Sequence, residues 1–349
     1  MNEERMERER NKTLLIVEGK KEEELLRRIF LFFPELTVFP ADILIHQANI
    51  YDLERIIQEE YGKNWDEEEI DLPFLVGRKK GQRLNLRDFS NVFLIFDFDP
   101  QDTFFSAGTI RRMCKHFCDA AYEGMLYINY PMVESYLHFS SLPDEAFFTR
   151  SVSLDVLKRT GANESYKSIV QRESAIAADL DTTENVQKQT DQLLGKSSKC
   201  AESLFQRIIT TDVSAYTDKN TVADLLSQWN PQLDLKRDKT KNTRRFALAD
   251  SMCKAAMLSY EGKTVSQRSQ TILRLIMQHC LKKALMLQGD ELALWDTEKN
   301  TAIKNAEVLY ERVLEAQLSY LSEEKTMQVL NTAVLLVFEY KKALLFDND

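Results

Sequence analysis

The sequence predicts an α/β fold in which a mostly parallel, Rossmann-like N-terminal sheet is followed by an all-helical C-terminal domain. In the first part, short apolar runs typical of buried strands alternate with stretches whose apolar residues recur at helical spacing. This alternation indicates βαβ units with right-handed crossovers. After about residue 150 only helical spacing remains. We therefore expect two domains, at residues 1–150 and 151–349, with a polar insertion or flap at about 63–90.

The elements of the first domain follow from the local pattern of apolar residues. The run from Thr13 to Val17 is short, apolar and β-rich, and predicts the first strand. Residues 20–33 show helical spacing that Pro34 ends. The run from Asn91 to Phe96 is almost continuously apolar, as expected of a strand covered on both faces. The remaining expected elements are a strand at 42–46, a helix at 50–61, a helix at 109–122 and a strand at 125–130.

The second domain shows the spacing of a helical bundle throughout. We expect it to serve regulation, oligomerisation, or the binding of a partner or substrate. The predicted helices lie at 165–180, 201–209, 221–229, 246–259, 268–287, 302–321 and 324–344.

The net negative charge of the chain comes entirely from its first 150 residues. Residues 1–150 carry 19 basic and 28 acidic side chains, whereas residues 151–349 carry 27 of each. An acidic domain repels a polyanion, so a nucleic-acid substrate would need bound cations and local basic patches. Two runs qualify, at residues 78–83 and 236–245, although each is also typical of a solvated loop.

Several classes of protein are disfavoured by composition. The charged N-terminal run has no apolar segment typical of a signal peptide, and no apolar stretch is long enough to span a bilayer. We therefore expect a cytoplasmic protein without membrane contact. Five cysteines without a Cys-x-x-Cys pair argue against a disulfide framework and a structural zinc site. In Cys114-x-His116-x-Cys118 the two cysteines share a helix face from which His116 points away.

Three predicted strands end in carboxylates. Glu18 ends the first strand, Asp97 and Asp99 end the third, and Glu134 follows the fourth. In an open α/β sheet the crevice at the carboxyl ends of the strands gathers such residues. Glu22 lies four residues beyond Glu18, at a helix start whose dipole favours anions. Clustered carboxylates without histidine indicate Mg²⁺ or Mn²⁺, which prefer oxygen ligands.

Two of these segments resemble the Toprim superfamily, over roughly residues 12 to 145. The resemblance rests on a strand running into Glu18-Gly19 and a later strand running into Asp97-x-Asp99. The additional Glu22 is more similar to the nuclease branch, which includes overcoming-lysogenization-defect nucleases, RloB-like proteins and stand-alone phage-defence effectors. The resemblance implies that Glu18 is a metal ligand or general acid/base and that both aspartates bind metal. The Pro-x-x-Glu stretch of these proteins resembles residues 131–134, which implies that Glu134 lies near the site.

The resemblance implies a metal-dependent nuclease that cuts RNA, such as tRNA, or DNA as a toxic effector in antiviral abortive-infection defence. Such toxicity needs restraint, which the helical domain would provide through a partner protein or a homo-oligomer. The run Gly77-Arg78-Lys79-Lys80-Gly81 lacks the spacing and the ending of a nucleotide-binding P-loop. Control by ATP would therefore come from a separate ATPase partner, as the resemblance suggests.

Two other functions remain open at this point. The first is a non-catalytic Toprim module that binds metal or nucleic acid as a sensor. The second is a phosphotransfer enzyme with Asp97 as nucleophile, which is disfavoured because that chemistry expects the acid pair on the first strand.

Further candidate residues have an ordinary structural explanation. His138 lies one helical turn beyond Glu134, but a single histidine in an apolar stretch is more often part of the core. Tyr216, Trp229 and Trp295 are candidates for stacking on bases, and aromatic residues at helical spacing are also more often buried.

Overall fold

The chain forms two compact units that are not consecutive halves of the sequence. The first comprises Met1–His138, Pro143–Glu173 and Ile276–Asp349, and the second comprises Phe139–Leu142 and Ser174–Leu275. The expected boundary at residue 150 therefore lies inside the first unit, to which the chain returns near its C-terminus. The computed structural model describes residues 12–38, 41–159, 164–196, 198–233, 239–258, 260–290 and 306–346.

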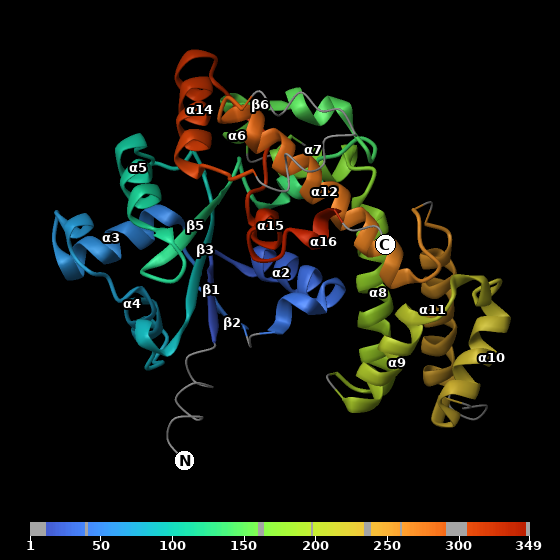
Figure 1. Cartoon of the computed structure of the whole chain (residues 1–349). Helices are drawn as coiled ribbons and strands as arrows, with labels where there is room; N and C mark the ends of the chain where they lie inside the picture. The colour runs from blue at the N-terminus through green and yellow to red at the C-terminus, as the bar shows by residue number, and fades with distance from the viewer. Residues whose placement is uncertain are drawn as a thin grey trace. The chain divides into compact units, whose positions relative to one another are not determined.

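A five-stranded sheet forms the centre of the first unit and confirms the predicted α/β class (Figure 1). The strand order is β2-β1-β3-β5-β4, and all neighbours pair in parallel except the short edge strand β4. Strands β1 and β3 are fully buried apart from the first residue of β3, as their apolar sequences predict. The strands are β1 (Thr13–Val17), β2 (Ala41–Ile45), β3 (Asn91–Asp97), β4 (Cys118–Asp119) and β5 (Gly124–Asn129).

Helices cover both faces of this sheet, with α3, α4 and α5 on one side and α2 and α15 on the other (Figure 1). The helices α2 (Lys20–Phe32) and α3 (Ile50–Tyr61) match the predicted ranges closely. The helix α5 (Ala107–His116) is shorter than predicted, because Cys118 and Asp119 pair with the start of β5 instead of continuing the helix.

The segment between α3 and β3 is packed, so of the two alternatives expected for residues 63–90 the structure agrees with an insertion and not with a flap. It contains the helix α4 (Leu72–Lys79), which Asp71 caps by accepting a hydrogen bond from the backbone N–H of Phe74. Trp65, Ile70 and Leu75 are fully buried. These three residues are surrounded in the sequence by charged ones, so the segment looks polar and its packing could not be predicted.

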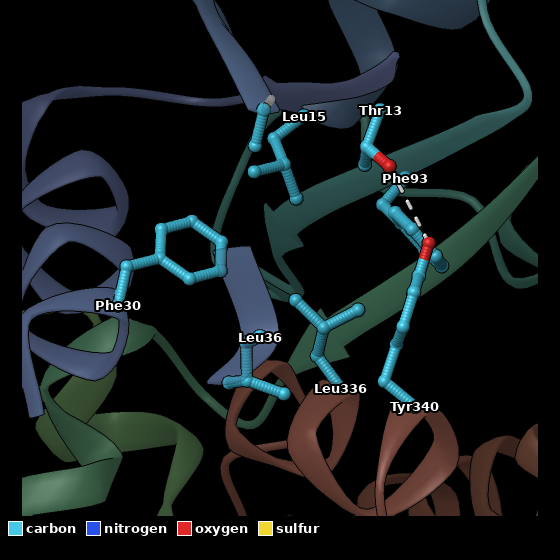
Figure 2. Close-up of a pocket in the computed structure, with 8 residues that line it drawn as sticks. Thr13, Leu15, Phe30, Leu36, Phe93, Leu336 and Tyr340 are labelled. Atoms are coloured by element: carbon cyan, nitrogen blue, oxygen red, sulfur yellow. Dashed lines mark hydrogen bonds between the residues drawn. The ribbon is translucent and has the colours of Figure 1, made fainter. Parts of the chain in front are cut away.

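The C-terminal segment returns to the sheet. The prediction of a helix at 324–344 is wrong, because β7 (Thr326–Gln328) pairs antiparallel with β6 (Ser151–Ser153). The short helix α15 (Leu336–Tyr340) then packs on β1 and β3. Figure 2 shows its residues Leu336 and Tyr340 beside Thr13 and Phe93, where a cavity of about 20 Å³ leaves space for roughly one water molecule. The segment is buried on all sides, which gives it no single apolar face to distinguish helix from strand.

The predicted helices at 201–209, 221–229, 246–259 and 268–287 correspond to helices at Lys199–Thr210, Lys219–Trp229, Lys239–Ala256 and Val265–Leu287. The predicted helix at 165–180 is divided at Ser174, and its second part continues to Leu194, well beyond the predicted end. The predicted helix at 302–321 begins at Tyr310 among the described residues, and residues 302–305 lie outside them. Among the described residues, no helix is both long and apolar enough to cross a membrane. The remaining helices of the first unit are α6 (Leu154–Leu157), α7 (Tyr166–Glu173), α14 (Tyr310–Glu323) and α16 (Ala343–Phe346). The second unit contains α8 (Ala177–Leu194), α9 (Lys199–Thr210), α10 (Lys219–Trp229) and α11 (Lys239–Ala256), and α12 (Val265–Leu287) passes from it to the first unit.

The start of β5 depends on a glycine. Gly124 has φ of +135°, and a Cβ at this position would lie 2.6 Å from a side-chain carbon of Leu94. Gly124→Ala should therefore lower the free energy of unfolding by roughly 2–4 kcal/mol, through backbone strain and overpacking together. Urea denaturation measures this change.

Gly108→Ala is the matched control, because Gly108 lies in the first turn of α5 and its added Cβ would make only an ordinary contact at 3.6 Å. We expect stability within about 1 kcal/mol of the wild type. Equal effects of the two substitutions would contradict the packing described for β5.

Candidate functional site

Two carboxylates lie between β1 and β3, at the switch point where the chain changes the side on which it adds the next strand. The chain leaves β1 toward β2 on one side, whereas it leaves β3 toward β5 on the other. Such switch points, at the carboxyl ends of the strands, form the binding crevice of open α/β sheets. Glu18 follows β1 and Asp97 ends β3, as predicted. The backbone N–H of Asp97 donates to Oε2 of Glu18 at 3.1 Å, and the N–H of Glu18 donates to the carbonyl of Ile95 at 3.0 Å.

The helix start after β1 brings a third carboxylate back toward the strand. Oε2 of Glu22 accepts a hydrogen bond from the backbone N–H of Gly19 at 2.8 Å and so caps α2. A Cβ on Gly19 would lie 3.3 Å from this carboxylate, so a small residue suits the position. Glu22 is only 3% exposed. The carboxylate of Glu22 is thus buried, unlike most capping side chains, and it lies close enough to Asp97 for its charge to raise the pKa of that residue. Glu22 therefore belongs to the same cluster as Glu18 and Asp97.

The loop after β3 holds the fourth carboxylate. Asp99 has φ of +43°, a left-handed conformation that residues other than glycine adopt infrequently and that aspartate tolerates better than most. Its Oδ1 accepts a hydrogen bond from Nε2 of Gln101 at 2.8 Å. On the adjacent strand, Nδ2 of Asn129 lies 3.3 Å from Oδ1 of Asp97 and donates to it. The two aspartates therefore have amide donors, which orient their carboxylates without neutralising them.

The acids raise one another's pKa. Burial raises the pKa of Glu18 to about 8, with further contributions from the charges of Asp99, Glu22 and Asp102. Burial also raises the pKa of Asp97 well above its ordinary value, and the nearby charges of Glu18 and Glu22 act in the same direction. The pKa values of Glu22 and Asp99 are raised for the same two reasons. The cluster is therefore unfavourable when all of its carboxylates are ionised.

Glu134 joins the cluster from the segment after β5. Its charge contributes to the raised pKa values of Asp97, Glu22 and Asp99, which places it within electrostatic range of all three. The ammonium group of Lys167 in α7 lies 2.5 Å from its carboxylate. The Lys167 side chain is 58% exposed, so it is a positive charge at the mouth of an acidic site. The sequence places Lys167 on a helix, but only the fold brings that helix to Glu134.

His138 belongs to the core. Its Nδ1 lies 3.1 Å from the hydroxyl of Tyr166, and its Nε2 lies 3.5 Å from the carboxylate of Glu173. Burial lowers the pKa of this imidazole. Both ring nitrogens are thus directed to residues other than Glu134, which agrees with the structural explanation of this histidine.

The cysteine and histidine motif is not a metal site in the described part of the chain. Cys114 is buried and Cys118 is exposed, so the two do not share an environment. His116 instead lies 3.0 Å from the carboxylate of Glu123, and its ring packs edge-on against Trp65.

The two candidate basic runs differ in structure. In the first run, Arg78 forms an ion pair with Glu60 at 2.7 Å. Burial lowers the pKa of His46 to about 4, and the nearby charges of Lys79 and Lys80 contribute to this shift. The second run is described only from residue 239, where it begins α11 and not a loop. There Arg245 donates to the hydroxyl of Ser227.

The aromatic residues considered for base stacking do not form an exposed surface. Tyr216 is buried, and its hydroxyl donates to the carbonyl of Ile208. Trp229 is partly covered by the guanidinium of Arg207, at 4.8 Å from the ring centre. Trp295 lies outside the described residues.

The donor set suits a hard divalent cation in its chemistry. Carboxylate oxygens are the ligands that Mg²⁺ and Mn²⁺ prefer, and the raised pKa values show that added positive charge would relieve the cluster. In this conformation, however, no three aspartate, glutamate, histidine or cysteine side chains within the described ranges are arranged to hold one ion. Ligation by Glu18, Asp97 and Asp99 together therefore requires their side chains to rearrange.

The raised pKa of Glu18 predicts how stability varies with pH. A carboxyl group whose pKa is raised from 4.5 to about 8 on folding stabilises the folded state most below pH 4.5, and this contribution is lost as the pH rises through 8. In EDTA, Glu18→Gln should therefore be more stable than the wild type at pH 8, by roughly 1–4 kcal/mol, and the difference should shrink at pH 5. Urea denaturation at both pH values measures it.

Glu59→Gln provides the control, because Glu59 is 63% exposed and forms an ordinary surface pair with Arg55. Its substitution should change stability little and equally at both pH values. A Glu18→Gln effect that is also independent of pH would contradict the mutual repulsion of the buried acids.

Comparison of the chain with protein-family models, with curated proteins and with solved structures finds no significant match. The resemblance to the Toprim superfamily therefore rests on the residues of its sequence motifs alone.

Proposed function

We propose that the chain is a divalent-metal-dependent nuclease that hydrolyses phosphodiester bonds of nucleic acid. The observation that supports this most strongly is the gathering of Glu18, Glu22, Asp97 and Asp99, from two separate strand ends, at the switch point of the sheet. These residues and Glu134 would hold Mg²⁺ or Mn²⁺. When bound, such an ion activates water and neutralises charge on the phosphoryl oxygens.

Glu18 is best suited to move a proton. One of its oxygens accepts the hydrogen bond from the backbone of Asp97, which fixes the orientation of the carboxyl group. Burial and the charges of Asp99 and Glu22 raise the pKa of Glu18 to about 8 in the protein without metal. A bound cation that offsets these charges would bring the pKa closer to neutral pH, where general acid and base catalysis is most effective. Glu18 would therefore take a proton from the attacking water or return one to the leaving oxygen.

Lys167 is suited to contact the substrate. Its ammonium group pairs with Glu134 at the exposed edge of the acidic cluster. A phosphate of an incoming strand would compete with that carboxylate for the lysine and would be held beside Asp97 and Asp99.

The same proposal includes the expectations that follow from the resemblance. These are an RNA or DNA target, an effector role in antiviral defence, an ATPase partner and a homo-oligomer.

A second function is favoured by one observation. Because no three of these side chains in the described structure converge on a single point, the chain is also a candidate for a module that binds metal or nucleic acid without cutting it. The two proposals differ in what the loss of an acid does. In a nuclease it abolishes both cleavage and toxicity, whereas in a binding module toxicity or signalling persists when metal binding is lost.

Asp97→Asn should abolish cleavage while leaving the fold intact, because it removes one buried negative charge and keeps the size of the side chain. The expected loss is about 100-fold or more, since a metal ligand supplies several kcal/mol of transition-state stabilisation. Purified protein is incubated with labelled tRNA, single-stranded DNA and duplex DNA in Mg²⁺ or Mn²⁺, and an EDTA sample establishes the metal dependence.

Asp250→Asn is the matched control. Asp250 is 44% exposed in the second unit, where it pairs with Lys254. This variant should cut like the wild type. Cleavage that survives Asp97→Asn, or that is lost because the variant unfolds, would count against the assigned site.

Lys167→Gln should weaken the binding of nucleic acid and reduce its salt dependence. Removing one phosphate contact lowers the slope of log K against log salt by about 1. Lys188→Gln is the control, because Lys188 is similarly exposed and also pairs with a glutamate, Glu184, but lies in the second unit. Fluorescence anisotropy at several salt concentrations gives both slopes, and equal slopes would exclude a phosphate contact by Lys167.

A further inference from the structure

The loop that begins at Asp99 presents an aromatic side chain to solvent. Phe104 is 72% exposed, whereas its neighbour Phe105 packs edge-on against Phe98 and Tyr51 in the core. Only Met257 is more exposed among the large apolar side chains of the described residues. Because Phe105 is anchored, the backbone directs Phe104 outward.

Hydrogen bonds hold this loop in place. The carboxylate of Asp102 accepts from the backbone N–H of Phe104 at 2.7 Å and from Nδ2 of Asn49 at 2.8 Å. Asn49 also caps α3 through its other side-chain atom. The backbone N–H of Asp102 in turn donates to the carbonyl of Asp99 at 3.0 Å. The backbone that carries the exposed ring of Phe104 is therefore held by hydrogen bonds in the same loop as Asp99.

A cleft beside the same loop gives a strand room to pass. Its volume is about 550 Å³, and Pro100, Phe105 and Ala107 line one side of it. Residues of α14 and the turn after it line the other side, including Lys325 and the serines at 319 and 322. Arg111 and Glu315, which form an ion pair at 2.6 Å, also line the cleft. Apart from this pair, the cleft offers apolar surface, hydroxyl groups and the ammonium group of Lys325 beside the loop that begins at Asp99, which suits a nucleotide next to the one being cut.

We propose that Phe104 stacks on an unpaired base of the substrate, so that the chain acts on single-stranded segments or loops and not on continuous duplex. This inference rests on the proposed nuclease function and names its substrate class. The bases of a duplex stack on each other and present only their edges, whereas unpaired bases present a face to an aromatic ring. Stacking of this kind tolerates different bases, so Phe104 selects for the unpaired state and not for sequence.

The test measures how Phe104 and one base depend on each other. End-labelled single strands, each with an abasic site at one position, are bound to the wild type and to Phe104→Ala in Ca²⁺, and affinity is measured by fluorescence anisotropy. In the wild type, one abasic position should weaken binding roughly 5- to 160-fold, which corresponds to about 1–3 kcal/mol for stacking of a base on an aromatic residue. In Phe104→Ala that position should have no further effect.

Two variants serve as controls. Phe104→Trp keeps an aromatic face and should retain the affinity of the wild type. Tyr122→Ala removes another exposed aromatic residue, 61% exposed in the turn before β5 and thus at the opposite end of the strands from the acids, and should also bind like the wild type.

The outcomes separate this inference from the proposed function. Wild type that cuts single strands while Phe104→Ala binds and cuts them equally well overturns the inference and leaves the nuclease standing. Coupling between Phe104 and one base without cleavage in any metal supports the inference and contradicts the nuclease. If Phe104→Ala instead alters only the sedimentation of the protein, the ring covers a protein surface, and the inference is wrong.

Discussion

The repulsion between buried carboxylates is the constraint on which this structure depends. Glu18, Glu22, Asp97 and Asp99 occupy one end of the sheet, and burial and mutual charge raise the pKa of each. A fold gains nothing in stability from such a group, because every ionised member makes the others less favourable. Protonation of the carboxyl groups removes this repulsion at low pH, and a bound divalent cation would offset it near neutral pH. The cluster is therefore better explained by function than by stability.

The rest of the first unit holds these acids in position. The strand order β2-β1-β3-β5 places the ends of β1 and β3 side by side, so residues far apart in the sequence face the same crevice. The C-terminal segment adds a support that is distant in sequence: the backbone N–H of Ala333 donates to Oδ1 of Asn129, and Asn129 donates to Asp97 through its amide nitrogen. Asn49 and Asp102 similarly connect the start of α3 to the loop that carries Phe104. The positions of Asp97 and of the loop that carries Phe104 thus depend on contacts with residues distant in the sequence.

Those long-range contacts also explain how much the sequence could predict. The strands that carry Glu18 and Asp97 are short continuous apolar runs, and parallel strands bring their carboxyl ends together in any sheet of this class, so the fold and the core of the site could be expected. Lys167 could not, because a lysine on a helix surface is ordinary until the fold places it 2.5 Å from Glu134. Phe104 likewise cannot be distinguished in the sequence from its neighbour Phe105, which packs on Phe98 and Tyr51. The segment at 324–344 is predicted as a helix because apolar residues recur along it, whereas in the fold Thr326–Gln328 pairs with a strand distant in the sequence.

Crystals grown with Mn²⁺ test the central claim most directly, through an anomalous difference map collected at the manganese absorption edge. We expect a peak at the ends of β1 and β3, with oxygens of Glu18, Asp97 and Asp99 at about 2.1 Å, the distance typical of small hard cations of this kind. Their side chains would then have moved together from the positions described for the protein alone. A well-ordered crevice without such a peak, or a peak held by other residues, would contradict the assignment of this site.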